Sequence, residues 1–191
     1  MRSDLFISGF GGQGVLLVGN LIAYAAIHEG KNVSFFPSYG VEKRGGAAMC
    51  TVVVAEGKVG SPVIGAPSAT IVLNQASMEK YAERVRQGGL LIVNSSLINY
   101  EPFTRNDIRV IAAPMNEIAM GLGDSRLVNM VAAGIYASRT STVGISSLIT
   151  ALSQVLPERN HRYIPLNVKA IEAGAAFDGD LKAATIYKDN A

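Results

Sequence analysis

A cluster of glycines inside a long uncharged stretch near the N-terminus constrains this fold more than any other feature. Residues 5–27 carry no formal charge and are long enough to span a lipid bilayer. The run GFGGQG at residues 9–14 interrupts them, and such a cluster favours a turn between a strand and a helix. Ahead of the stretch, Asp4 follows Arg2, unlike the basic start of a signal peptide. We therefore expect a cytoplasmic α/β segment and no membrane span.

The segments on either side of the turn fit this interpretation. Residues 5–8 form a short apolar strand candidate, and residues 15–29 have the length and apolar spacing of a helix that stops at Gly30. Residues 32–36 read as a second strand, which we expect Pro37 to end. A strand, a glycine turn, a helix and a strand in this order open a Rossmann-like domain.

Strands continue to alternate with helices further along the chain. The expected strands are residues 47–55, 70–73, 90–93 and 108–112, and the expected helices are residues 75–86, 126–138, 146–155 and 165–177. We predict an α/β, Rossmann-like three-layer domain at residues 1–178, with a mostly parallel sheet, a helical C-terminal third and a polar, flexible tail at 179–191. The helix at 126–138 is apolar almost all round, so we expect it in the core or under a partner.

Composition narrows the classes of function. Charged residues make up 17% of the chain, against about a quarter in average soluble domains, so we expect a partner chain to cover part of the surface. The net charge is +2 without a basic cluster, which excludes a nucleic-acid footprint. Cys50 is the only cysteine. It can form no internal disulfide and hold no iron–sulfur cluster, and it reads as a buried structural thiol.

The glycine run matches the G-x-G-x-x-G pattern of phosphate-binding turns. Its glycines allow a close backbone approach, and the helix that follows offers free N–H groups to an anion. A tight turn that only packs helix on sheet is the alternative. An NAD site also needs an acidic residue at the end of the second strand, and residues 35–39 contain none. Lys43 and Arg44 leave NADP binding open.

A second candidate site is the charged loop YGVEKRGG at residues 39–46, which follows the second strand. Arg44 stands beside Gly45 and Gly46, which has the form of an anion clamp made of a guanidinium group and accessible backbone N–H groups. An ordinary solvated loop is the alternative. No metal-ligand spacing and no nucleophile elbow occurs, and Gly123-Asp124-Ser125 is only a fragment of a thiamine diphosphate motif. We therefore predict no catalytic residue and no metal ligand in this chain.

Together the two motifs resemble the gamma subunits of 2-oxoacid:ferredoxin (flavodoxin) oxidoreductases, a family that acts on pyruvate, ketoisovalerate or 2-oxoglutarate. That family's usual pattern is G-x-G-G-Q-G-V followed by S-Y-G-P-E-x-R-G-G. Four segments of this chain match it in order, at residues 9–17, 37–46, 125–131 and 166–174. Val41 stands where proline is common, which affects only the stiffness of the loop.

The resemblance implies an oxidoreductase that is active only as part of a complex. Such complexes convert a 2-oxoacid and coenzyme A to acyl-CoA and CO2 and reduce ferredoxin or flavodoxin, an iron–sulfur or flavin protein acceptor. Thiamine diphosphate, magnesium and the iron–sulfur clusters belong to the alpha, beta and delta partner subunits, so this chain is expected to bind no cofactor alone. The isolated chain is expected to form a homodimer through its partner-binding surface.

The resemblance also suggests which residues face coenzyme A. The expected binding residues come from the glycine run and the charged loop, and they are Gly11, Gly12, Gln13, Tyr39, Gly40, Arg44, Gly45 and Gly46. A purely structural role for the first three is the alternative. Other functions left open are an indolepyruvate oxidoreductase small subunit, an independent NADP-binding oxidoreductase and an interaction subunit without a ligand. We expect the substrate of the complex to be 2-oxoglutarate or a broad range of 2-oxoacids.

Overall fold

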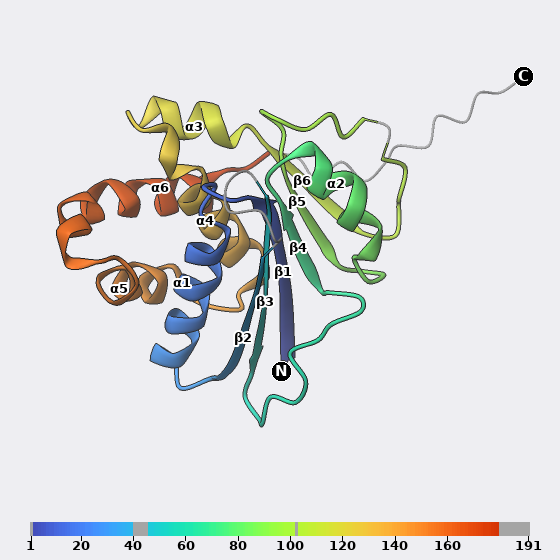
Figure 1. Ribbon diagram of the computed structural model, residues 1–191, viewed down its shortest axis with the longest axis horizontal. Coiled ribbons are helices and arrows are strands. Elements are labelled where there is room, and N and C mark those ends of the chain that lie inside the picture. The colour runs from blue at the N-terminus through green and yellow to red at the C-terminus, as the bar shows by residue number, and fades with distance from the viewer. Residues whose placement is uncertain (1, 40–45, 102, 180–191) are drawn as a thin grey trace, which may run out of the picture.

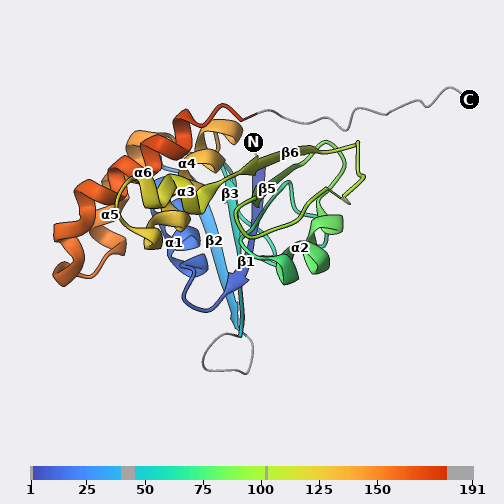
Figure 2. The ribbon, with the colours of Figure 1, turned by 90° about the horizontal axis from the view of Figure 1, so that it is seen from above.

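The computed structural model describes residues 2–39, 46–101 and 103–179 and forms three layers around one sheet. In Figures 1 and 2, helix α2 covers one face of the sheet, and α1, α4, α5 and α6 lie on the other. The three-layer α/β fold expected from the sequence is confirmed. The predicted tail and the residues Gly40, Arg44 and Gly45 lie outside the described residues, apart from residue 179.

The sheet has six strands among the described residues. They are β1 (Arg2–Phe10), β2 (Asn32–Tyr39), β3 (Ala47–Ala55), β4 (Ala69–Val72), β5 (Leu90–Asn94) and β6 (Arg109–Ala113). Their order is β2-β3-β1-β4-β5-β6. β1, β4, β5 and β6 pair in parallel, whereas β3 is antiparallel to both β1 and β2. The sheet is therefore mostly parallel, as predicted, with β3 as the reversed strand.

The expected end of the second strand at Pro37 is wrong. β2 continues through Pro37, which is paired in register with Cys50 of β3, and ends at Tyr39. Proline lacks a backbone N–H and is tolerated in a strand that has a neighbour on one side only. β2 is such an edge strand, because it stands at the end of the strand order.

The helices follow the predicted positions with shifted ends. They are α1 (Val15–His28), α2 (Gln75–Tyr81), α3 (Met115–Gly121), α4 (Val128–Thr140), α5 (Ile145–Val155) and α6 (Ile164–Ala176). Three 3₁₀ segments accompany them: η1 (Ala82–Arg84), η2 (Ser125–Leu127) and η3 (Glu158–Tyr163). α2 is shorter than the helix expected at 75–86, because η1 takes the place of its C-terminal part. α4 begins at Val128 and not at residue 126, because η2 precedes it. The short helix α3 was not predicted.

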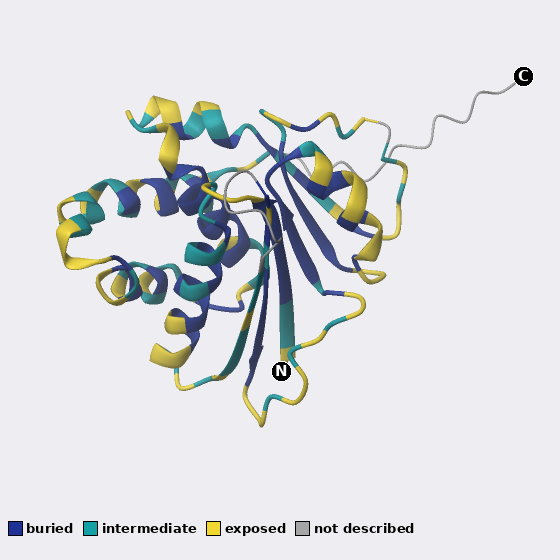
Figure 3. Cartoon of the chain, viewed as in Figure 1, coloured by how far each residue is buried: buried dark blue, intermediate teal, exposed yellow. Residues whose placement is uncertain are grey.

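Helix α4 is buried within the chain itself. Every residue from Val128 to Ala137 is buried, and Figure 3 shows it dark blue beneath α6. Small residues let the two helices approach closely: a Cβ on Gly134 would overlap the backbone oxygen of Ile171, and one on Gly174 would overlap the backbone oxygen of Val131. The apolar helix that the sequence placed in the core or under a partner therefore belongs to the core.

Substitution of Gly134 by alanine should destabilise the protein, because the new methyl group has no room between α4 and α6. We expect a loss of about 1–3 kcal/mol in the free energy of unfolding, as for other overpacked cores. Urea denaturation followed by circular dichroism measures it. Gly121→Ala in α3 is the matched control, because no described residue beyond its own helix and chain neighbours lies within 4 Å of the place its methyl group would take. Equal midpoints for the two variants would contradict the close crossing.

Cys50 lies in the core on β3, beneath α1. It is 1% exposed, and its Sγ lies 3.6 Å from the backbone oxygen of Val15. A Cβ on Gly19 of α1 would overlap this Sγ and the ring of Phe35, each at 2.6 Å, so the helix packs closely against the thiol. Burial raises the pKa of the Cys50 thiol to about 12. The structural thiol expected from the sequence is confirmed.

Native Cys50 should resist alkylation by iodoacetamide at pH 8. With a pKa so far above the solution pH, only about one thiol in ten thousand is ionised, and the thiolate is the reactive form. Mass spectrometry of the intact chain follows the reaction, with the urea-unfolded chain as the control that must react within minutes. Fast labelling of the folded chain would show that the thiol is accessible.

Candidate functional site

The glycine turn joins β1 to α1 at the carboxyl end of the sheet. Gly12 (φ 102°) and Gly14 (φ 76°) have left-handed backbones that favour glycine. The N–H of Gly11 donates to the backbone oxygen of Gly46 at 2.9 Å, so the turn contacts the residue that follows the charged loop. Tyr39 ends β2 on the other side of that loop. The two sequence motifs are therefore adjacent where the structure describes them.

Gln13 holds the turn in place through its side-chain amide. Its Oε1 accepts from the backbone N–H of Phe10 at 2.7 Å and from Asn74 Nδ2 at 3.0 Å, and its Nε2 donates to the backbone oxygen of Leu73 at 3.2 Å. Asn74 in turn caps α2 by accepting from the N–H of Ser77 at 2.9 Å. These bonds give Gln13 a structural part in joining the turn to β4 and α2.

The strand order separates this turn from a dinucleotide site. In a Rossmann half the second strand lies beside the first, so its terminal acid reaches the ribose of a nucleotide bound on the glycine turn. Here β3 lies between β1 and β2, and β2 ends without an acidic residue at Tyr39. The geometry gives no support to NAD binding in the Rossmann manner.

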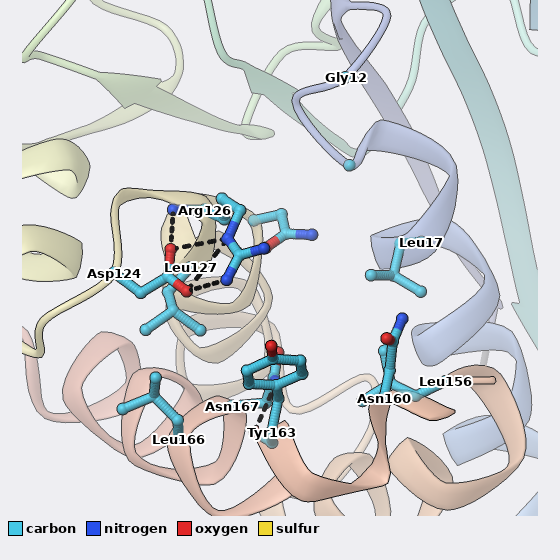
Figure 4. A pocket seen from close by; sticks show the side chains of 12 residues that line it. Gly12, Leu17, Asp124, Arg126, Leu127, Leu156, Asn160, Tyr163, Leu166 and Asn167 are labelled. Atoms are coloured by element: carbon cyan, nitrogen blue, oxygen red, sulfur yellow. Dashed lines mark hydrogen bonds and ion pairs between the residues drawn. The ribbon is translucent and has the colours of Figure 1, made fainter. Parts of the chain in front are cut away.

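A pocket of about 280 Å³ opens beside the turn, between α1 and the C-terminal helices (Figure 4). Residues from four parts of the chain line it: Gly12, Gly14, Leu17, Asp124, Arg126, Leu127, Asn129, Leu156, Asn160, Tyr163, Leu166 and Asn167. Its wall thus mixes leucines with three amide side chains, one ion pair and one tyrosine. Of the expected residues that the structure describes, only Gly12 lines this pocket.

Arg126 is the basic side chain in the wall of the pocket. It pairs with Asp124 at 2.6 Å and its guanidinium carbon lies 5.6 Å from the ring centre of Tyr163. The Arg126 side chain is 74% exposed, and its hydrogen bonds hold the pKa of Asp124 below its usual range. Figure 4 shows Asp124 and Arg126 linked on one side, with Leu17 of α1 across the opening.

A second hollow also borders Gly12. It measures about 240 Å³ and is lined by Gly12, Gln13, Leu97, Asn116, Ser125, Arg126 and Val128. The two hollows share Gly12 and Arg126, which therefore stand between them.

Three of the predicted site residues, Gly11, Gly12 and Gln13, lie at this end of the sheet. Gly46 joins them through its hydrogen bond with Gly11. Sequence reasoning missed Arg126, although it lies in one of the four matched segments.

The chain offers no ligand set for a metal or an iron–sulfur cluster in its described part. No group of three His, Cys, Asp or Glu side chains gathers there. A cluster needs about four thiolates, and the full sequence has one cysteine. The helices of the described ranges all fall short of the length and hydropathy that a bilayer span requires.

A family model described as pyruvate ferredoxin/flavodoxin oxidoreductase matches residues 4–177. The chain belongs to this family. The ketoisovalerate oxidoreductase subunit VorA of Methanothermobacter thermautotrophicus is 35% identical over 172 residues, which cover 90% of this chain but 35% of VorA. The 2-oxoglutarate synthase subunit KorC of Methanocaldococcus jannaschii is 29% identical over 160 residues, covering 83% of this chain and 86% of KorC. The chain therefore spans about a third of VorA but most of KorC.

Solved structures agree with the family. The gamma subunit of a keto/oxoacid ferredoxin oxidoreductase from Geobacter sulfurreducens is 30% identical, with a TM-score of 0.76 over 91% of this chain and 94% of that one. The 2-oxoglutarate:ferredoxin oxidoreductase from Magnetococcus marinus shares the fold, with a TM-score of 0.83 at 22% identity, over 92% of this chain and 30% of that one. The resemblance to gamma subunits inferred from the sequence is confirmed.

Replacing Gln13 by alanine should loosen the glycine turn. Three hydrogen bonds are lost at a half-buried position, and we expect the free energy of unfolding to fall by about 1–3 kcal/mol. Thermal and urea unfolding measure the change. Gln154→Ala is the matched control, because Gln154 is exposed and bonds only His28 among the described side chains. A Gln13 variant as stable as the Gln154 variant would argue against this structural part.

Proposed function

We propose that this chain is the gamma subunit of a multisubunit 2-oxoacid:ferredoxin or flavodoxin oxidoreductase. The complex converts a 2-oxoacid and coenzyme A to acyl-CoA and CO2. The observation that carries the proposal is the near full-length match to a gamma subunit and to KorC, together with a family model over residues 4–177. A small domain without a metal-ligand cluster in its described part fits a subunit whose chemistry depends on other chains.

The cofactors are assigned to partner chains. Thiamine diphosphate and magnesium belong to the alpha and beta subunits, and the iron–sulfur clusters to beta and delta. What supports this division is the single cysteine of the full sequence, which cannot hold a cluster, and the lack of a metal-ligand group among the described residues. This chain then contributes binding surface and leaves electron transfer to its partners.

The charged loop and the glycine turn are proposed to face the active site of the complex and to position coenzyme A. The support is their adjacency, since Gly11 bonds Gly46 at the end of the loop. Arg44 supplies the positive charge of the proposed anion clamp, and the described residues leave the space beside the α-carbon of Gly12 free for a phosphate that approaches the backbone. The substrate is proposed to be 2-oxoglutarate or a broad range of 2-oxoacids, in agreement with the KorC relatives.

Purification of the tagged chain from its native host without oxygen tests the proposed function. We expect larger chains in stoichiometric amounts, the brown absorbance of iron–sulfur clusters, and ferredoxin reduction when a 2-oxoacid and coenzyme A are supplied. Comparing pyruvate, ketoisovalerate, indolepyruvate and 2-oxoglutarate identifies the substrate. A colourless chain that elutes alone under these conditions would contradict the proposal.

Arg44→Ala should raise the KM of the complex for coenzyme A by roughly tenfold while leaving the KM for the 2-oxoacid unchanged, because a charge-assisted contact to a phosphate is lost. Steady-state kinetics of the purified complex measure both constants. Arg109→Ala serves as the control, since Arg109 is exposed on the opposite edge strand β6. Wild-type kinetics in an intact Arg44 variant would exclude the clamp.

A further inference from the structure

The edge strand β2 lacks the charged side chains that commonly protect the edge of a sheet. It pairs with β3 on one side, and in the described sheet no strand lies on its other side. Its sequence, NVSFFPSY, contains no Lys, Arg, Asp or Glu. Pro37 is the one residue of β2 that hinders pairing, because its nitrogen carries no hydrogen and faces the open side of an edge strand. The part of β2 before Pro37 is therefore open to a further strand.

Helix α1 continues this uncharged surface beside β2. From Val15 to His28 the helix contains no Asp, Glu, Lys or Arg. Gly19 faces the sheet, where a Cβ would overlap the ring of Phe35. Tyr24 and Ile27 lie outside that face and are 41% and 57% exposed, and Phe36 of β2 is 49% exposed. Figure 3 shows the lower turns of α1 partly in yellow and β2 largely in teal. Tyr24, Ile27 and residues 32–36 are called the β2–α1 surface below.

The lack of charge indicates which partner the β2–α1 surface fits. A twofold dimer brings one patch against the same patch of the second copy, so a charge near its centre would meet its own like. Residues 15–28 and 32–39 carry no formal charge, with histidine neutral. Just before β2, Glu29 and Lys31 are paired with each other at 2.6 Å. The surface is therefore electrostatically complementary to a second copy of itself.

The exposed apolar area suits a reversible dimer. A Phe or Tyr side chain carries about 150–250 Å², so Tyr24 and Phe36 each leave roughly 100 Å² exposed. Together with Ile27 and the open side of the strand, two copies would bury on the order of 1,000 Å² in total, which is the low end of specific interfaces. Such an area fits association that depends on protein concentration.

Pro37 also limits the register of the pairing. Backbone N–H groups of alternate residues point to the same side of a strand, so Val33 and Phe35 share the open side with Pro37 but keep their donors. Both donors are used, clear of Pro37, when Ser34 lies opposite Ser34 of an antiparallel second strand. We propose that two copies of this chain form a twofold dimer through the β2–α1 surface in this register.

The dimer leaves the candidate site open. Ser34 at its centre precedes Tyr39, the end of β2, by a distance of roughly 16 Å along the strand. The glycine turn and the charged loop lie beyond that end. The inference therefore goes beyond the proposed function and does not depend on which complex the chain joins.

A cysteine at position 34 tests the register. Opposite residues of a non-hydrogen-bonded antiparallel pair have Cα atoms about 4.5 Å apart, within the range that a disulfide bridges. Ser34→Cys in the full-length chain should therefore give a disulfide-linked dimer on mild oxidation, seen by intact mass spectrometry and non-reducing electrophoresis. The wild-type chain should give none, because Cys50 is buried.

Ser38→Cys is the matched control for the cross-link. Ser38 is half-buried on the same face of the same strand as Ser34. In the proposed register the two copies of residue 38 are roughly 26 Å apart, so no disulfide between them can form. Circular dichroism of both variants shows that the fold is intact.

Ile27→Lys tests the part of the surface that α1 contributes. It removes an exposed apolar side chain and places two like charges at the interface, so we expect the dissociation constant of the dimer to rise at least tenfold. Sedimentation velocity of the full-length chain over a range of concentrations measures it. Met120→Lys is the matched control, because Met120 is 66% exposed and lies on α3, not on the β2–α1 surface. Its dimerisation should equal that of the wild type.

The outcomes decide between a second copy and another occupant. Cross-linking of Ser34→Cys but not Ser38→Cys, together with weaker association of Ile27→Lys, supports the dimer. The inference is overturned if the wild-type chain stays monomeric at every concentration, if the two cysteine variants cross-link alike, or if Ile27→Lys associates as Met120→Lys does. A disulfide from Ser34→Cys to a larger chain in the purified complex also overturns it, because the surface then belongs to another subunit. Co-purification of larger chains, which tests the proposed function, is read separately.

Discussion

The antiparallel pairing of β1 with β3 is the constraint on which the rest of the site depends. The register runs from Arg2 opposite Ala55 to Phe10 opposite Ala47, so the start of β3 lies beside the glycine turn. That register brings Gly46, which follows the charged loop, to the turn, where its backbone oxygen accepts from the N–H of Gly11 at 2.9 Å. A shift by one residue would also turn the apolar face of β3 away from α1. One pairing thus fixes both the core and the position of the candidate site.

Local signals in the sequence were sufficient to predict most elements. Apolar runs bounded by glycines located β3, β5 and the long helices, because each signal is contained within its own segment. The strand order was not predictable in this way. Whether residues 47–55 pair with β1, with β2 or with both depends on contacts between distant segments, and the sequence pattern is the same in each case. Pro37 was misread for the same reason, since only the strand order shows that β2 is an edge.

The candidate site was predicted only in part, for a related reason. The glycine turn is a local pattern, so Gly11, Gly12 and Gln13 could be identified from their spacing. Asn129 and Arg126 could not, because each acquires its position from the packing of α4 and η2 against a turn more than a hundred residues earlier. The one signal that pointed to them was the matched segment at 125–131.

The polarity of the sheet explains why these separate parts gather at one end. β1, β4, β5 and β6 run in the same direction, so the residues that follow them all emerge at their carboxyl ends, where α/β folds bind ligands. Asn74 follows β4 and Asn116 follows β6, and both reach the neighbourhood of Gln13, the first by a hydrogen bond and the second in the shared hollow. Because β3 displaces β2 from its Rossmann position, and β2 itself ends without an acidic residue, that end lacks the arrangement of a classical dinucleotide site.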